Sequence, residues 1–347
     1  MKKKIVALLL IFASVMGLAS CNMNKNPKTE RVVGFFSTAF TVTDHSGLRN
    51  KKFAALVDEV REELAYYDKL LDSEDEQDGM VNIATLNANA GMGALEVSED
   101  MIDFLSYCKE MYYLTDGIIN ITAGRLISIW NKYQSRGGEN NHTEDEIIAI
   151  ESGLAEAKKH MNIDDLVIDE ESRRVRILDK EMVLDVSAIS KGYVLERVTE
   201  ELRDEGYDKV VLGVDGSLAA IGEKGDGGAF EVGIRNPDTK AKDPYIHRLE
   251  IRNTACASAE AYGKNYEISG KINYQFFDME TFLVADNFSS VTVVAPDAAL
   301  ATALSHALFV MNYDEGKALL ETLDGIRAVW VYANGKVVDS VDFDNQN

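Results

Sequence analysis

A lysine and a glycine stand at the start of an expected helix, within the stretch from residue 184 to residue 222. Asp185 precedes Lys191 and Gly192, and the residues that follow have the amphipathic spacing of a helix. The first turn of a helix carries unpaired N–H groups and a partial positive charge, which suit an anion. The pattern predicts a site for an anionic ligand. The alternative is a lysine that is simply a solvated surface residue at a helix start.

The elements that must position this lysine occur as separate runs of strands and helices. The expected elements are a strand over 31–44, helices over 52–72, 97–117 and 143–160, a hairpin over 165–186, a meander of antiparallel strands over 230–278, a strand and a helix over 289–311, and a last helix and hairpin over 313–340. Helices segregated from antiparallel strands indicate an α+β fold.

The charge balance excludes one class of partner. The 347 residues include 36 Lys and Arg against 58 Asp and Glu, a formal net charge of −22. So acidic a protein repels nucleic acid, and we expect no nucleic-acid partner. An acidic protein that handles an anion needs a local basic group or a metal ion, which draws attention back to Lys191.

The N-terminal sequence predicts export and attachment to a membrane. A basic start and a short apolar run fit a secretory signal, and the run ends in Leu18-Ala19-Ser20-Cys21, which resembles the lipobox of bacterial lipoproteins. We therefore expect a signal peptide over 1–20, a lipid on Cys21, and a polar tether over 21–30. The protein would then be anchored to the cell membrane on its extracytoplasmic face. Cys108 and Cys256 have no framework spacing and are expected to be independent buried thiols.

Several short motifs follow one another in a specific order. They are "FFSTAF", "TDGIINITAGRLISIW", "DVSAISKGY", "GVDGSLAAIG", "FEVGIRNP", "YQFFDMET" and "VTVVAPDAALATALSHALFV". In order and approximate spacing, from about Val33 to Val338, the chain resembles the ApbE family of FAD:protein FMN transferases.

This resemblance implies a fold and an activity. The fold would be ApbE-like and T-fold-related, with antiparallel sheets and packed helices in two intimately packed halves over 31–341, before a tail over 342–347. The activity would use FAD as substrate with Mg²⁺, and would transfer FMN to a threonine of an acceptor flavoprotein.

The resemblance also implies roles for individual residues. The catalytic residues would be Asp278 and Lys191. The residues around the flavin nucleotide would be Phe36, Thr38, Asn87, Ile118, Ile119, Asn120, Asp185, Lys191 and Gln275. The metal would be bordered by the Ala188 carbonyl, Thr302 and His306.

The metal positions depart from the family pattern. Thr302 stands in place of a metal-binding aspartate, His306 in place of a threonine, and Gln275 in place of a histidine. A neutral hydroxyl is a weak ligand for a hard cation. In one interpretation another carboxylate replaces the missing one; the candidates are Asp215, Glu260 and Asp278. In the other, the chain is a catalytically degenerate flavin- or nucleotide-binding lipoprotein of the same fold. A third class is a surface protein that binds peptides or partners without flavin.

Overall fold

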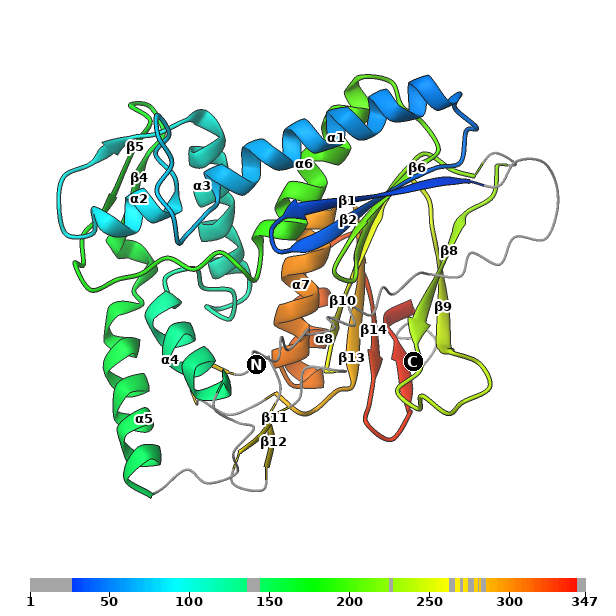
Figure 1. The fold of residues 1–347 in the computed structure, drawn as a ribbon. Coiled ribbons are helices and arrows are strands. Elements are labelled where there is room, and N and C mark those ends of the chain that lie inside the picture. The colour runs from blue at the N-terminus through cyan, green and yellow to red at the C-terminus, as the bar shows by residue number, and fades with distance from the viewer. Residues whose placement is uncertain are drawn as a thin grey trace, which may run out of the picture.

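The computed structural model describes residues 27–135, 144–224, 227–261, 266–268, 271–273, 278–279, 281 and 285–341. It has a large sheet with helices packed against one face, and a smaller, mostly helical part lies beyond those helices, on the same side of the sheet (Figure 1). The long helices α1 (Asn50–Leu70) and α6 (Ser190–Asp204) pass above the edge of the large sheet. The predicted α+β fold, with antiparallel sheets and packed helices, is confirmed.

The large sheet has eight strands in the order β1-β2-β6-β7-β10-β13-β14-β15, and every neighbouring pair is antiparallel. Its strands are β1 (Lys28–Phe35), β2 (Thr38–Asp44), β6 (Val210–Val214), β7 (Ser217–Ile221), β10 (Ala255–Glu260), β13 (Ser290–Ala295), β14 (Arg327–Val331) and β15 (Val337–Asp339).

The remaining described strands form smaller sheets. They are β3 (Leu95–Glu96), β4 (Leu166–Asp169) and β5 (Arg174–Ile177) in one sheet, β8 (Phe230–Arg235) and β9 (Tyr245–Ile251) in a second, and β11 (Tyr266–Ile268) and β12 (Lys271–Asn273) in a third. The meander expected over 230–278 is therefore divided, because β10 leaves its neighbours in sequence and pairs with β7 and β13.

The other helices are α2 (Ile83–Ala88), α3 (Glu99–Leu114), α4 (Gly124–Ser135), α5 (Glu144–Ala157), α7 (Ala298–Val310) and α8 (Tyr313–Leu320), with short 3₁₀ turns over 158–160 and 163–165. Capping residues in the sequence fix the starts of two of these helices. Ser98 caps α3 by accepting a hydrogen bond from the Met101 N–H, and Asp297 caps α7 in the same way.

The core lies on both faces of the large sheet. Alternate residues of β10 point to opposite faces: Ala257 belongs to the cluster under α7, whereas Cys256 belongs to the cluster under the β8–β9 hairpin. The small side chains of β10 meet alanines on α7, so the helix and the sheet pack closely. Helix α7 is the most deeply buried helix beside the sheet, and its face toward α6 becomes part of the candidate site.

Two local expectations differ from the structure. The strand expected over 31–44 is a hairpin, because Phe36 and Ser37 both adopt positive φ and reverse the chain between β1 and β2. Strand β1 begins at Lys28, inside the range expected as tether, because that residue already pairs with Asp44.

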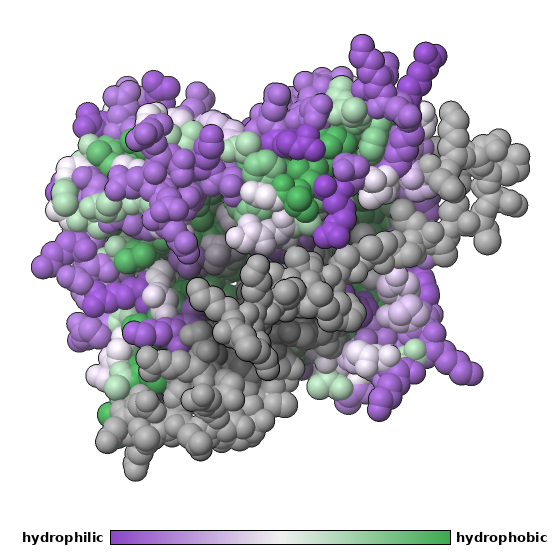
Figure 2. All heavy atoms as spheres, viewed as in Figure 1, coloured by the Kyte–Doolittle hydropathy of each residue, from purple (hydrophilic) through white to green (hydrophobic). Residues whose placement is uncertain are grey.

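The thiols and the surface agree with the sequence. Cys108 and Cys256 are free and buried, as predicted, and burial raises the pKa of Cys256 to about 12. Hydrophilic side chains cover most of the coloured surface in Figure 2, in keeping with the net charge. In the part of the chain that the structure describes, no helix is both long enough and apolar enough to cross a bilayer. Residues 1–20 and Cys21 lie outside it.

Candidate functional site

Lys191 lies at the centre of a polar link between three elements. Its Nζ is 2.5 Å from Oδ2 of Asp215, and Oδ1 of the same carboxylate accepts a hydrogen bond from the Thr38 hydroxyl at 2.6 Å. The Lys191 side chain is 32% exposed and that of Asp215 is 46% exposed. The amine therefore faces a protein carboxylate at the surface of the site rather than open solvent.

The sheet register brings these residues together. Strands β2 and β6 pair with Thr41 opposite Gly213, so Thr38, which begins β2, lies level with the turn after β6. That turn consists of Asp215 and Gly216, both with positive φ, a geometry that Asp and Gly tolerate. The two hairpin tips thus meet at one end of the sheet, beside the start of α6.

Helix α6 begins without a side-chain cap. Its N-cap residue is Ile189, which cannot accept a hydrogen bond through its side chain. Helix starts carry orphan N–H groups and a partial positive charge, so this end, with Lys191 in its first turn, favours an anion. The anion site that the sequence predicts depends on this helix start.

Gly192, the next residue of α6, is pressed against α7. A Cβ on Gly192 would lie 2.2 Å from Oγ1 of Thr302, closer than any real contact, so only glycine fits. The Thr302 hydroxyl is buried and lies 2.9 Å from the Ser217 hydroxyl on β7. The position where the family pattern has an aspartate is here a neutral, hydrogen-bonded hydroxyl pair. Sequence reasoning missed Ser217, because only the packing of α7 on β7 places it there.

The segment before α6 is fixed by its backbone. The Asn87 side chain donates to the Leu184 carbonyl at 3.0 Å and accepts from the Leu184 N–H at 2.7 Å. The next N–H, of Asp185, donates to the Ile121 carbonyl. Asn87 therefore lies beside the Asp185 backbone, its amide holds that backbone, and the contact of both residues with a nucleotide stays a prediction. Ala188 follows, exposed, just before the helix.

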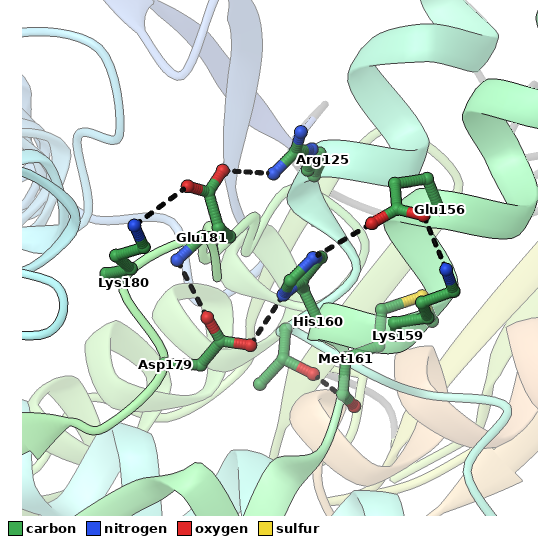
Figure 3. A network of polar contacts seen from close by, with 9 residues as sticks. Arg125, Glu156, Lys159, His160, Met161, Asp179, Lys180 and Glu181 are labelled. Carbon is green, nitrogen blue, oxygen red and sulfur yellow. Dashed lines mark hydrogen bonds and ion pairs between the residues drawn. The ribbon is translucent and has the colours of Figure 1, made fainter.

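An ion-pair network anchors the start of the same segment (Figure 3). Asp179 Oδ2 lies 2.7 Å from His160 Nδ1, and Glu181 lies 2.5 Å from Arg125. Desolvation raises the pKa of Asp179, but the hydrogen bonds from the Glu181 backbone N–H and from His160 outweigh it and hold the pKa below its usual value. These contacts tie residues 179–181 to α4 and to the turn after α5.

The loop after α3 carries three predicted nucleotide residues. Ile119 is buried and its N–H donates to the Thr115 hydroxyl, whereas Ile118 is half-buried. Asn120 is buried too: its amide donates to the Met161 carbonyl, and its oxygen accepts from both the N–H and the hydroxyl of Thr122. In this structure Asn120 shapes the loop, and its contact with a nucleotide stays a prediction.

The other predicted residues lie at different places. Phe36 is half-buried at the β1–β2 turn, and its N–H donates to Asp68. His306 lies one turn beyond Thr302 on α7 and is partly buried. Asp278 accepts a hydrogen bond from the Thr281 N–H at 3.0 Å. Gln275 lies outside the described residues.

A magnesium site is not complete in the described donor set. Mg²⁺ prefers octahedral oxygen ligands that include carboxylates. Thr302 supplies a hydroxyl already paired with Ser217, and the nearby carboxylate of Asp215 is paired with Lys191. Across the residues that the structure describes, no group of three or more His, Cys, Asp or Glu side chains could hold a metal ion. The described residues alone therefore do not fit this ion.

A separate hollow of about 810 Å³ lies beside the C-terminal half of α6. Its lining is the set Glu63, Tyr66, Tyr67, Asp100, Arg197, Glu200, Glu201, Arg203, Asp204 and Glu205. Burial, followed by the nearby Glu201, raises the pKa of Glu63 to about 7. A predominantly acidic lining repels a diphosphate, so this hollow does not compete with the start of α6 as an anion site.

Fold and site together define a protein class. The family model described as "ApbE family" matches residues 36–330, and the chain belongs to this family. The matched range contains both hairpin tips and the starts of α6 and α7.

Known relatives cover most of the chain. The FAD:protein FMN transferase of Haemophilus influenzae is 22% identical over 335 residues, covering 92% of this chain and 90% of the relative. The protein of the same name from Klebsiella pneumoniae is 25% identical over 257 residues, covering 74% and 76%.

Solved structures agree on the fold. The ApbE protein of Thermotoga maritima has a TM-score of 0.75 at 22% identity, covering 92% of this chain and 99% of that one. The apo flavinyl transferase ApbE of Pseudomonas stutzeri has a TM-score of 0.73 at 21% identity, covering 92% and 96%.

Proposed function

We propose that this protein transfers FMN from FAD to an acceptor protein. The observation that carries the proposal is Lys191 in the first, uncapped turn of α6, held toward the site by Asp215. The family membership and the names of the relatives indicate FAD as the substrate. The diphosphate of FAD is the anion that this site would bind.

The chemistry that the site would support is phosphoryl-type transfer. The hydroxyl oxygen of an acceptor threonine attacks the phosphorus on the FMN side of the diphosphate, the P–O bond to AMP breaks, and AMP leaves. The hydroxyl proton passes to a base, for which Asp278 is the candidate. Lys191 and the helix start would offset the negative charge of the diphosphate throughout.

The environment of the nucleotide follows from the fixed segments. In this proposal Asp185 would hold the nucleotide and the Ala188 carbonyl would border the metal, and the Asn87 bonds to Leu184 fix the backbone just before them. Magnesium dependence is part of the proposal through the family resemblance. No step is assigned to the ion, because the described donors do not fit it.

The test is an incubation of the purified protein with FAD and a threonine-bearing acceptor flavoprotein, with MgCl₂ or with EDTA. With MgCl₂ we expect covalent flavin fluorescence on the acceptor and release of AMP. We expect both signals to be lost with EDTA and in Lys191→Ala. Bound FAD without transfer would instead support a non-catalytic flavin-binding protein. A preparation that binds no flavin would support a surface protein of another kind.

The membrane anchor is a second part of the proposal. It rests on the Leu18-to-Cys21 sequence, and the wild-type protein should fractionate with membranes and carry a lipid-modified N-terminal cysteine. Cys21→Ser should abolish the lipid mass. An unmodified Cys21 in the mature wild-type protein would contradict the anchor.

A further inference from the structure

We infer that Asp215 is a positioning residue: it orients the Lys191 ammonium toward the diphosphate from the tip of the β6–β7 hairpin. The inference rests on the proposed function and deepens it. It concerns a carboxylate that the sequence suggested only as a possible replacement ligand for the metal.

Asp215 is held on both sides. One carboxylate oxygen lies 2.5 Å from Lys191 Nζ, and the other accepts from the Thr38 hydroxyl at 2.6 Å. Thr38 belongs to the first hairpin and Lys191 to α6, so the carboxylate connects three elements that are distant in sequence. A carboxylate fixed by two partners can in turn fix a flexible lysine.

The turn itself does not require the negative charge. Asp215 has φ 42° and Gly216 has φ 88°, and Asn-Gly adopts this two-residue turn as readily as Asp-Gly. An asparagine would keep the turn and an oxygen for the Thr38 hydroxyl. The charge acts on Lys191, and Asp215→Asn removes that effect while it keeps the turn and the contact with Thr38.

The lysine keeps donors for a ligand. An ammonium has three N–H donors, and one is directed at Asp215. With that donor fixed, the flexible stem is restrained and the other two donors have defined directions. Lys191 lies in the first turn of α6, so these donors act beside the positive end of the helix.

Two effects of the carboxylate oppose each other. Its charge repels a diphosphate, but at 46% side-chain exposure water screens that repulsion. Its attraction for Lys191 acts at 2.5 Å, whereas a diphosphate bound to the other two donors of the ammonium would lie farther from the carboxylate, so the attraction is the stronger of the two. Orientation therefore outweighs repulsion, and removal of the carboxylate weakens the binding of FAD.

The test is a double-mutant cycle on FAD binding, followed by flavin fluorescence, with Asp215→Asn, Lys191→Met and the double variant. We expect Asp215→Asn to raise the Kd for FAD about threefold to tenfold, and to leave that for riboflavin, which has no phosphate, unchanged. In the Lys191→Met background the same change should have no effect on FAD. An equal loss in both backgrounds, or an unchanged or lower Kd, would overturn the inference.

A second measurement detects the Lys191–Asp215 contact without flavin. Lysines can be labelled by reductive ¹³C-methylation, and Lys191→Arg identifies the resonance of Lys191. We expect this resonance to be broad in the wild-type protein and to narrow in Asp215→Asn as the side chain gains rotational freedom. An unchanged line width would overturn the positioning role.

The outcomes separate this inference from the proposed transfer. If FAD binding depends on Asp215 through Lys191 but no FMN reaches an acceptor, the positioning role stands and the transfer fails. If transfer proceeds equally well in Asp215→Asn, the transfer stands and the positioning role fails. If no FAD binds, the proposed function fails and the resonance of Lys191 alone decides the positioning role.

Discussion

Gly192 and Thr302 occupy the crossing point of α6 and α7, where a Cβ on Gly192 would lie 2.2 Å from Oγ1 of Thr302. The absence of a side chain at 192 lets α6 approach α7 closely. The approach sets the start of α6, and hence Lys191, beside the hairpin tip that carries Asp215. The packing of two buried helices thus decides where a surface lysine points.

Gly192→Ala should destabilise the fold although alanine favours helices. The added methyl group meets Thr302 and cannot be accommodated without a shift of one helix, at a cost of about 1–3 kcal/mol. Urea unfolding measures the loss. Gly153→Ala on α5 is the matched control, because its Cβ would meet only Ile129 at an ordinary 3.5 Å. Equal stabilities of the two variants would contradict the packing argument.

Lys191→Ala should weaken FAD binding by about tenfold, since a charge-assisted hydrogen bond to a phosphate is lost from a partly exposed site. Titration of flavin fluorescence measures the dissociation constant. Lys180→Ala is the control, because this side chain is 80% exposed and lies outside the site. Unchanged affinity in Lys191→Ala would count against the site itself.

Thr302→Asp tests the metal position. A carboxylate here should create a preference for Mg²⁺, so that MgCl₂ raises both the FAD affinity and the melting temperature of this variant more than those of the wild type. Without the ion, the buried charge should destabilise the variant, because Thr302 is only 6% exposed. Thr302→Asn is the control, because asparagine has the same size as aspartate but carries no charge. The idea fails if magnesium acts equally on Thr302→Asp and Thr302→Asn.

Glu196 should make stability depend on pH. Burial raises its pKa from 4.5 to about 7; nearby Asp297 adds to the rise and the Ala298 N–H opposes it. The folded-state pKa lies above the unfolded one, so the contribution is full below pH 4.5 and is lost as the pH rises through about 7. A shift of this size corresponds to roughly 3 kcal/mol.

Urea unfolding at pH 5 and at pH 8 measures this effect. Glu196→Gln should reduce the pH dependence in this window, because the amide cannot ionise, and Glu63 should account for part of what remains. Glu321→Gln, just after α8 with a side chain 62% exposed, serves as the control and should leave the dependence intact. A wild-type stability that does not fall between the two pH values would contradict the assignment.

Local features could be predicted from the sequence because neighbouring residues decide them. The apolar period of α1, the Ser98 cap of α3 and the Asn334-Gly335 turn between β14 and β15 all depend on contacts within a few residues. The order of the motifs likewise indicated the family without any coordinates. The position of Lys191 at the start of α6 could also be predicted, because it depends only on neighbouring residues.

The tertiary structure alone decided which side chains meet. Thr38 and Asp215 are 177 residues apart, and they touch because β2 pairs with β6 in one particular register. Thr302 lies against Gly192 and Ser217 because α7 packs between α6 and the sheet. Such contacts depend on the register of strands and the crossing of helices, which are collective results of packing the whole core, so no local pattern of residues encodes them.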